Sequence, residues 1–107
     1  MASSREFLDF VMEQLSPLGD VSFRPMMGEY VIYYQGKPVG GIYDDRFLIK
    51  KTRSAEALAG WDGDVPETDI PYPGAKAMLV ADPDDRERTC RIIKAAASDL
   101  PEPKPKK

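Results

Sequence analysis

The residues of this chain that could do chemistry are few, and the rarest of them is a single cysteine, Cys90. The sequence contains no histidine, which is the commonest general base and the commonest transition-metal ligand among side chains. A cysteine attacks substrates as its thiolate, which needs a neighbouring base or cation to form. At helical spacing Cys90 shares a face with Arg86, Ile93 and Ala97. We interpret Cys90 as a packed or half-buried thiol and expect no enzymatic activity.

Carboxylates gather in two places, and both patterns are more typical of surface structure than of a site. The segment from residue 60 to 74 is expected to be a loop and carries Asp62, Asp64, Glu67 and Asp69. Its Asp-x-Asp spacing lacks the further ligands and the closing glutamate of a calcium loop. The adjacent Asp44 and Asp45, followed by Arg46, are typical turn formers. We therefore expect no metal, no cofactor and no paired-carboxylate catalysis.

Glycines and cations do not indicate phosphate or nucleic-acid chemistry either. Gly40 and Gly41 stand inside a strand pattern, whereas a phosphate-cradling loop opens a helix. Two basic clusters, Lys50, Lys51 and Arg53, and Arg86, Arg88, Arg91 and Lys94, could touch phosphates. The second cluster is interleaved with carboxylates, and the whole chain has a net charge of −3. We expect no direct nucleic-acid binding.

The most unusual segment for binding is the stretch from residue 24 to 30. Adjacent methionines in an extended stretch point to opposite sides, so only one of them can enter the core. The other is a flexible apolar group beside residue types that are enriched at binding hot spots. The simpler interpretation is a tight connection in which the glycine supplies a conformation that other residues avoid. The predicted partner-binding residues are Arg24, Met26, Met27, Gly28, Glu29 and Tyr30.

We call residues 24–30 the corner. The predicted elements that hold it in place begin and end with helices. Ser3 and Glu6 form a capping-box pattern before an apolar stripe at helical spacing: Phe7, Leu8, Val11, Met12 and Leu15. A short helix is predicted at 54–58, with Ser54 as its cap. The closing helix is expected to begin at Asp82 with Pro83 in its first turn. Its apolar stripe is Ile92, Ile93, Ala96, Ala97 and Leu100.

Between the helices the pattern changes to strands. β-Branched, aromatic and aliphatic runs predict strands at 31–34, 38–43 and 47–49, with short turns between them. A further edge strand is predicted at 21–24, stopped by Pro25, and an added strand within 76–81. The connections are too short for parallel crossovers, so the sheet is an antiparallel meander of three to four strands plus one added strand. Packed with N- and C-terminal helices, it predicts a two-layer α+β fold.

Composition indicates one domain in a reducing compartment. The chain has 107 residues, of which 42% are hydrophobic, enough for one core. We predict a single domain over 1–100 and a disordered Pro/Lys tail over 101–107. No secretory signal or membrane-length apolar run is visible, and a lone cysteine makes no internal disulfide. We expect a cytoplasmic protein with no membrane partner.

A known family matches these motifs in order. Residues 23–37 read Phe-Arg-Pro-Met-Met-Gly-Glu-Tyr-Val-Ile-Tyr-Tyr-Gln-Gly-Lys, and residues 45–50 read Asp-Arg-Phe-Leu-Ile-Lys. These runs resemble the Arg-x-Met-Phe-Gly-Glu/Gly-Tyr signature, the Tyr-x-x-Gly hairpin and the following strand of the N-terminal domain of TfoX/Sxy competence regulators. Residues 71–76 and 84–86 resemble short, stand-alone members of that family. Met27 stands where the family usually has Phe, which conserves apolar bulk.

The resemblance implies an α+β domain with a curved antiparallel sheet, no cofactor, and control of DNA-uptake genes through other transcription proteins. Full-length TfoX/Sxy proteins carry a second, helical domain, and we expect this chain to lack one. The leading hypothesis is a non-enzymatic protein-interaction domain, an accessory in bacterial transcriptional regulation. The alternative is a small-molecule-binding module with a cleft beside the sheet. Residues 31–34 are apolar at consecutive positions, so both sheet faces need a cover: a helix, a loop, or a second copy in a homodimer through the sheet.

Overall fold

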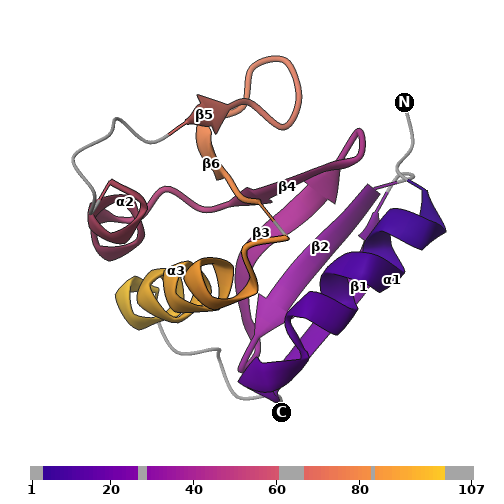
Figure 1. Cartoon of the computed structure of the whole chain (residues 1–107). Coiled ribbons are helices and arrows are strands. Elements are labelled where there is room, and N and C mark those ends of the chain that lie inside the picture. Colours follow the sequence, from indigo (N-terminus) through magenta and orange to yellow (C-terminus); the bar gives the residue numbers. More distant parts are fainter. Residues whose placement is uncertain (1–3, 27–28, 61–66, 83, 101–107) are drawn as a thin grey trace, which may run out of the picture.

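A six-stranded antiparallel sheet forms one layer of the molecule, and helices form the other (Figure 1). The computed structural model describes residues 4–26, 29–60, 67–82 and 84–100. The strand order in the sheet is β1-β2-β3-β4-β6-β5. The strands are β1 (Val21–Met26), β2 (Glu29–Tyr34), β3 (Lys37–Tyr43), β4 (Arg46–Ile49), β5 (Thr68–Asp69) and β6 (Met78–Val80). The helices are α1 (Arg5–Gln14), the 3-10 turn Ser16–Leu18, α2 (Arg53–Ala59) and α3 (Arg86–Asp99). The predicted α+β fold class is confirmed.

Two-residue turns set the register of the central meander. Gln35 and Gly36 have φ angles of 53° and 77°, and Asp44 and Asp45 have φ angles of 53° and 57°. Two successive positive φ values are typical of the tight hairpin turn that matches the right-handed twist of paired strands. Aspartate tolerates this conformation better than most residues do, which confirms Asp44 and Asp45 as turn formers.

A bulge interrupts the pairing of β2 and β3 beside Gly40. The register shifts between Ile32, which pairs with Gly40, and Tyr33, which pairs with Pro38. A Cβ atom at Gly40 would lie 2.2 Å from the backbone oxygen of Leu48 on the neighbouring strand. Only a glycine permits the two backbones to come this close.

One face of the sheet is closed by α1 and α3, with α2 packed against α3 (Figure 1). The strand side chains that point toward these helices are buried completely or nearly so, and they are Ile32, Val39, Ile42, Phe47 and Ile49. Leu8, Val11 and Leu15 meet them from α1 and the residue that follows it, and Ile93 and Ala96 meet them from α3. The predicted helical stripes therefore build the core.

Among the described residues, the opposite face is covered only in part, and by a loop. Leu48 pairs with Gly41 and Val80 and points away from the helices, yet it is fully buried. The connection between β5 and β6, residues 70–77, lies over this face. A helix, a loop or a second copy was expected to cover this face, and the structure shows a loop there. Val31 and Tyr33 remain half-buried.

All three predicted helix caps were wrong by one to three residues. Ser4, not Ser3, caps α1 by accepting a hydrogen bond from the Phe7 N–H, and Ser3 lies outside the described residues. Thr52, not Ser54, caps α2. Asp85, not Asp82, caps α3, and the predicted first-turn residue Pro83 lies outside the described residues. Each region holds several residues able to cap, and tertiary contacts choose among them.

Two strand predictions also needed correction. β1 continues through Pro25 to Met26, because an edge strand leaves one side of the backbone without a ladder partner and tolerates the missing N–H. The loop expected at residues 60–74 contains the short strand β5, which pairs with β6. Asp62 and Asp64 of that loop lie outside the described residues, as do Met27 and Gly28.

Candidate binding surface on the open face of the sheet

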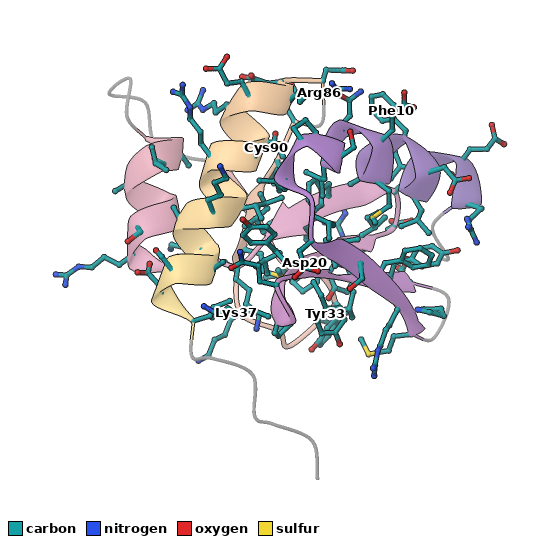
Figure 2. All side chains as sticks on the ribbon, turned by 90° about the horizontal axis from the view of Figure 1, so that it is seen from below. Phe10, Asp20, Tyr33, Lys37, Arg86 and Cys90 are labelled. Carbon is teal, nitrogen blue, oxygen red and sulfur yellow. The ribbon has the colours of Figure 1, made fainter. Side chains whose placement is uncertain are left out.

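The strand register decides which of the predicted corner residues share a face. Met26 pairs with Glu29, and Arg24 pairs with Val31, so these four side chains point away from the helices. The Arg24 guanidinium lies 5.9 Å from the ring centre of Tyr33, within range of a cation–π contact. Figure 2 shows Tyr33 on the side of the sheet opposite α1. We call this side, formed by residues 24, 26, 29, 31 and 33 together with their β3 and β4 neighbours, the open face.

Tyr30 lies on the other side of the sheet. Its ring meets the ring of Phe23 edge to face, with centroids 5.8 Å apart, and both residues pack against the core. The structure therefore brings Arg24, Met26 and Glu29 together on the open face and separates Tyr30 from them. Tyr30 therefore contributes to the packing of the fold.

Met26 is the centre of an apolar patch that the sequence did not reveal. Its side chain is 46% exposed, and it lines a hollow of about 410 Å³ together with Glu29, Tyr43, Pro71 and Tyr72. Tyr72 is 58% exposed and meets the ring of Tyr43 edge to face, with centroids 6.4 Å apart. We call these five residues the Met26 patch. Ile70, on the loop beside Pro71, adds a third exposed large apolar side chain.

The loop that carries Tyr72 is held in place by Arg46 and by its own turn. Arg46 pairs with the Asp69 carboxylate and donates a hydrogen bond of 3.3 Å to the Ile70 carbonyl. The Arg46 hydrogen bond, followed by the Ile70 N–H, lowers the pKa of Asp69. The Ala75 N–H donates to the Tyr72 carbonyl, and Gly74 has a φ of 88°, as in a type II turn. The exposed tyrosine therefore sits on a defined turn.

Cys90 belongs to the helix layer and not to this surface. It is buried between α3 and α1, and its Sγ lies 3.7 Å from the Gln14 carbonyl oxygen (Figure 2). Burial raises the pKa of the Cys90 thiol, although Arg86 and Lys94 act in the opposite direction. This combination confirms the prediction of a packed thiol and leaves little thiolate at neutral pH.

The described part of the chain offers little else for chemistry. Within it, no group of three or more His, Cys, Asp or Glu residues is arranged to hold a metal ion. Of the helices in that part, none is both long enough and apolar enough to cross a membrane.

The described residues form an open antiparallel sheet with helices on one face and a loop over part of the other. This architecture is that of a small α+β domain. The chain belongs to the TfoX N-terminal domain family, whose family model matches residues 13–96. This match confirms the resemblance drawn from the motifs, and the family is regulatory rather than enzymatic.

A curated relative of similar length matches the chain from end to end. The chain is 36% identical over 109 residues to an uncharacterized 12.7 kDa protein in the trpE 5′ region of Spirochaeta aurantia. The alignment covers 100% of this chain and 91% of that relative.

Proposed function

We propose that this domain is a non-enzymatic protein-interaction module of the bacterial cytoplasm, an accessory in transcriptional regulation of the competence-regulator type. Membership of the TfoX N-terminal domain family supports the regulatory part. The observation that carries the interaction part is the Met26 patch, where Met26 and Tyr72 expose large apolar side chains around one hollow.

The chemistry of the Met26 patch fits a protein partner. Methionine adapts its shape to an apolar partner, and tyrosine supplies a rigid ring with a polar tip. Arg24 and Glu29 place both signs of charge beside these groups, which gives the polar rim typical of protein interfaces. The partner's contact surface should accordingly centre on an apolar side chain that enters the hollow.

The arrangement of cations supports action through a partner rather than through DNA. On α3 the Arg91 guanidinium lies 2.6 Å from the Glu87 carboxylate, and on α1 Arg5 lies 2.9 Å from Asp9. Cations that are paired with carboxylates release few counterions from a phosphate backbone. Fluorescence anisotropy at physiological salt should show no binding of duplex DNA by the isolated domain at low-micromolar protein.

The test compares matched glutamate variants in affinity capture from a competence-proficient bacterial lysate, followed by mass spectrometry and reconstitution with the purified partner. Met26→Glu and Tyr72→Glu should each weaken binding of the purified partner at least about tenfold, because each places a charge in an apolar contact. Ala57→Glu, an exposed alanine on α2, is the control and should bind as the wild type does.

Two outcomes would contradict the proposal. Equal binding by all three variants would place the interface elsewhere on the molecule. A concentration-dependent dimer in light scattering that Met26→Glu abolishes would make the occupant of the patch a second copy of this chain, as the homodimer expectation has it.

A further inference from the structure

Beside the Met26 patch lies a larger groove, of about 680 Å³, between the open face and the loop at residues 70–77. Val31 and Pro38 contribute its apolar surface from the sheet, and Tyr43 and Tyr72 contribute aromatic surface. Its volume falls in the range of small-molecule sites, about 300–1,000 Å³. This groove adjoins the Met26 patch and shares Tyr43, Pro71 and Tyr72 with it.

The charged side chains that line the groove, among the described residues, are all cations. Lys50, Lys51 and Lys76 line it, and no carboxylate is present among the described residues of its lining. Outside the lining, the Glu56 carboxylate lies 3.7 Å from the Lys51 ammonium, and Glu29 lines the adjoining hollow with Tyr43. A chain with a net charge of −3 thus gathers three ammonium groups around one hollow. Such a local concentration of cations attracts an anion.

Strand pairing brings these lysines together from distant parts of the sequence. β4 and β6 pair antiparallel, with Ile49 opposite Leu79. The chain continues from β4 into Lys50 and Lys51, while Lys76 lies two residues before β6 begins, so the two segments run past each other at the groove. The β4–β6 pairing therefore brings the chain segments that carry Lys50, Lys51 and Lys76 side by side.

Tyr43 adds a hydrogen-bond donor to the apolar part of the groove. A Cβ atom at Gly41 would lie 2.7 Å from the Tyr43 ring and 2.8 Å from its hydroxyl, so the glycine allows the ring to lie flat on the sheet. Burial, followed by the neighbouring Tyr72 and Glu29, raises the pKa of Tyr43. The hydroxyl consequently keeps its proton at neutral pH and can donate it to an anionic oxygen.

We propose that this groove is a binding site for a small organic anion, a carboxylate or phosphate attached to an apolar or aromatic body. Lys50 and Lys76 bind the anionic group, and the Tyr43 hydroxyl donates a hydrogen bond to it. Val31 and Tyr72 pack against the apolar body. Charge-assisted hydrogen bonds give the anion its preference, and burial of the apolar body supplies the remaining affinity.

Amide chemical shifts of the full chain, at low ionic strength, test this with probes that share one aromatic ring. Phenyl phosphate and benzoate represent the two anionic groups, benzyl alcohol and benzylamine represent the neutral and cationic controls, and inorganic phosphate lacks the ring. We expect phenyl phosphate or benzoate to shift the amides of residues 40–41, 50–52 and 74–78, with a Kd on the order of 1 mM. The stronger of the two identifies the preferred anion, and each control should bind at least about fivefold more weakly.

Matched variants make the test specific to the groove. Lys50→Gln combined with Lys76→Gln should weaken anion binding at least about tenfold, and Tyr43→Phe about threefold. Lys94→Gln, which removes one cation from α3 outside the groove, should stay within about twofold of the wild type. The single Lys76→Gln variant, at an exposed position, provides a folded test if the double variant loses its native spectrum.

The proposal would be overturned by unshifted groove amides, by benzylamine or benzyl alcohol shifting them as strongly as the anions, or by equal weakening in Lys94→Gln. A glutamate-rich peptide that shifts these amides while both aromatic anions leave them unchanged would make the groove a contact for an acidic protein segment instead. None of these results depends on Met26, so the proposed protein contact is tested separately.

Discussion

The two faces of the same sheet differ in how they are covered. On the face toward α1 and α3, Ile32, Phe47 and Ile49 are buried completely or nearly so and meet amphipathic helices. On the open face Val31 is half-buried and Met26 is 46% exposed, and the only described cover is a loop. The helix-covered side of the sheet thus builds the core, whereas the other side is buried at Leu48 and leaves Met26 accessible.

This difference separates folding from binding residue by residue. Because successive side chains of a strand alternate between faces, neighbours in sequence have different tasks. In β2, Ile32 packs in the core while Val31 and Tyr33 line the open face. A family motif that runs through such a strand therefore combines positions kept for packing with positions available to a ligand or partner.

The largest expected effect is the loss of a core side chain. Phe47→Ala should lower the free energy of unfolding by about 3–5 kcal/mol, because it leaves a cavity among the most buried side chains. Val31→Ala, on the open face, should cost only about 1 kcal/mol. Urea unfolding monitored by circular dichroism measures both. Equal costs would show that the open face is as tightly packed as the core and would break the comparison.

The next effect concerns the backbone that both faces share. Gly40→Ala should cost about 1–3 kcal/mol, because the added methyl would overlap the Leu48 carbonyl oxygen and the strands would have to separate. The expected result is a lower urea midpoint with an unchanged slope. A midpoint equal to that of the wild type would show that the bulge can absorb the methyl group.

Sequence patterns predicted the helix-covered face well and the open face poorly, for a physical reason. Local periodicity predicts which side chains are buried in the core. It does so for the stripe from Leu8 to Leu15 and for the runs around Ile32 and Phe47. The open face depends on which distant segments meet. Lys50 and Lys76 come together only through the β4–β6 pairing, and no local sequence pattern predicts which strands pair.

The candidate site shows the same limit. Alternation placed one of the two adjacent methionines at the surface without saying which, and the structure exposes Met26. The sequence placed Tyr72 only within a loop motif. Its contact with Tyr43 on the open face is a tertiary contact that local patterns do not predict. The cap prediction for α2 was wrong for a related reason. Ser54 donates hydrogen bonds from its N–H and its hydroxyl to the Asp99 carboxylate of α3, at 2.7 and 2.9 Å, and Thr52 caps the helix instead.

A smaller effect is expected at Cys90, in the helix layer. Cys90→Ser should cost at most about 1–2 kcal/mol at neutral pH. Iodoacetamide should modify the native thiol more slowly than the thiol unfolded in urea, because burial raises its pKa and limits access. Native reaction at the unfolded rate would contradict the burial.

The same pKa shift predicts how stability depends on pH. Because the folded pKa of Cys90 lies above the unfolded one, folding favours the neutral thiol. Its contribution is complete below the unfolded pKa, about 8.5, and is lost as the pH rises through the folded value. As the pH rises above about 8.5, the wild type should therefore lose more stability than Cys90→Ser does. Parallel curves for the two proteins would contradict this.

The smallest effect on stability, and the sharpest contrast between the faces, comes from the same substitution at two methionines. Met26→Glu should leave the free energy of unfolding within about 0.5 kcal/mol, because its side chain is already 46% exposed. Met12→Glu, on α1, should cost more than about 1 kcal/mol, because Met12 packs against the core and the carboxylate would lose water there. Thermal and urea unfolding of the two variants beside the wild type measure this difference. If Met26→Glu destabilises the domain as much as Met12→Glu does, Met26 contributes to folding. Weaker partner binding by the Met26→Glu variant would then not be evidence for an interface.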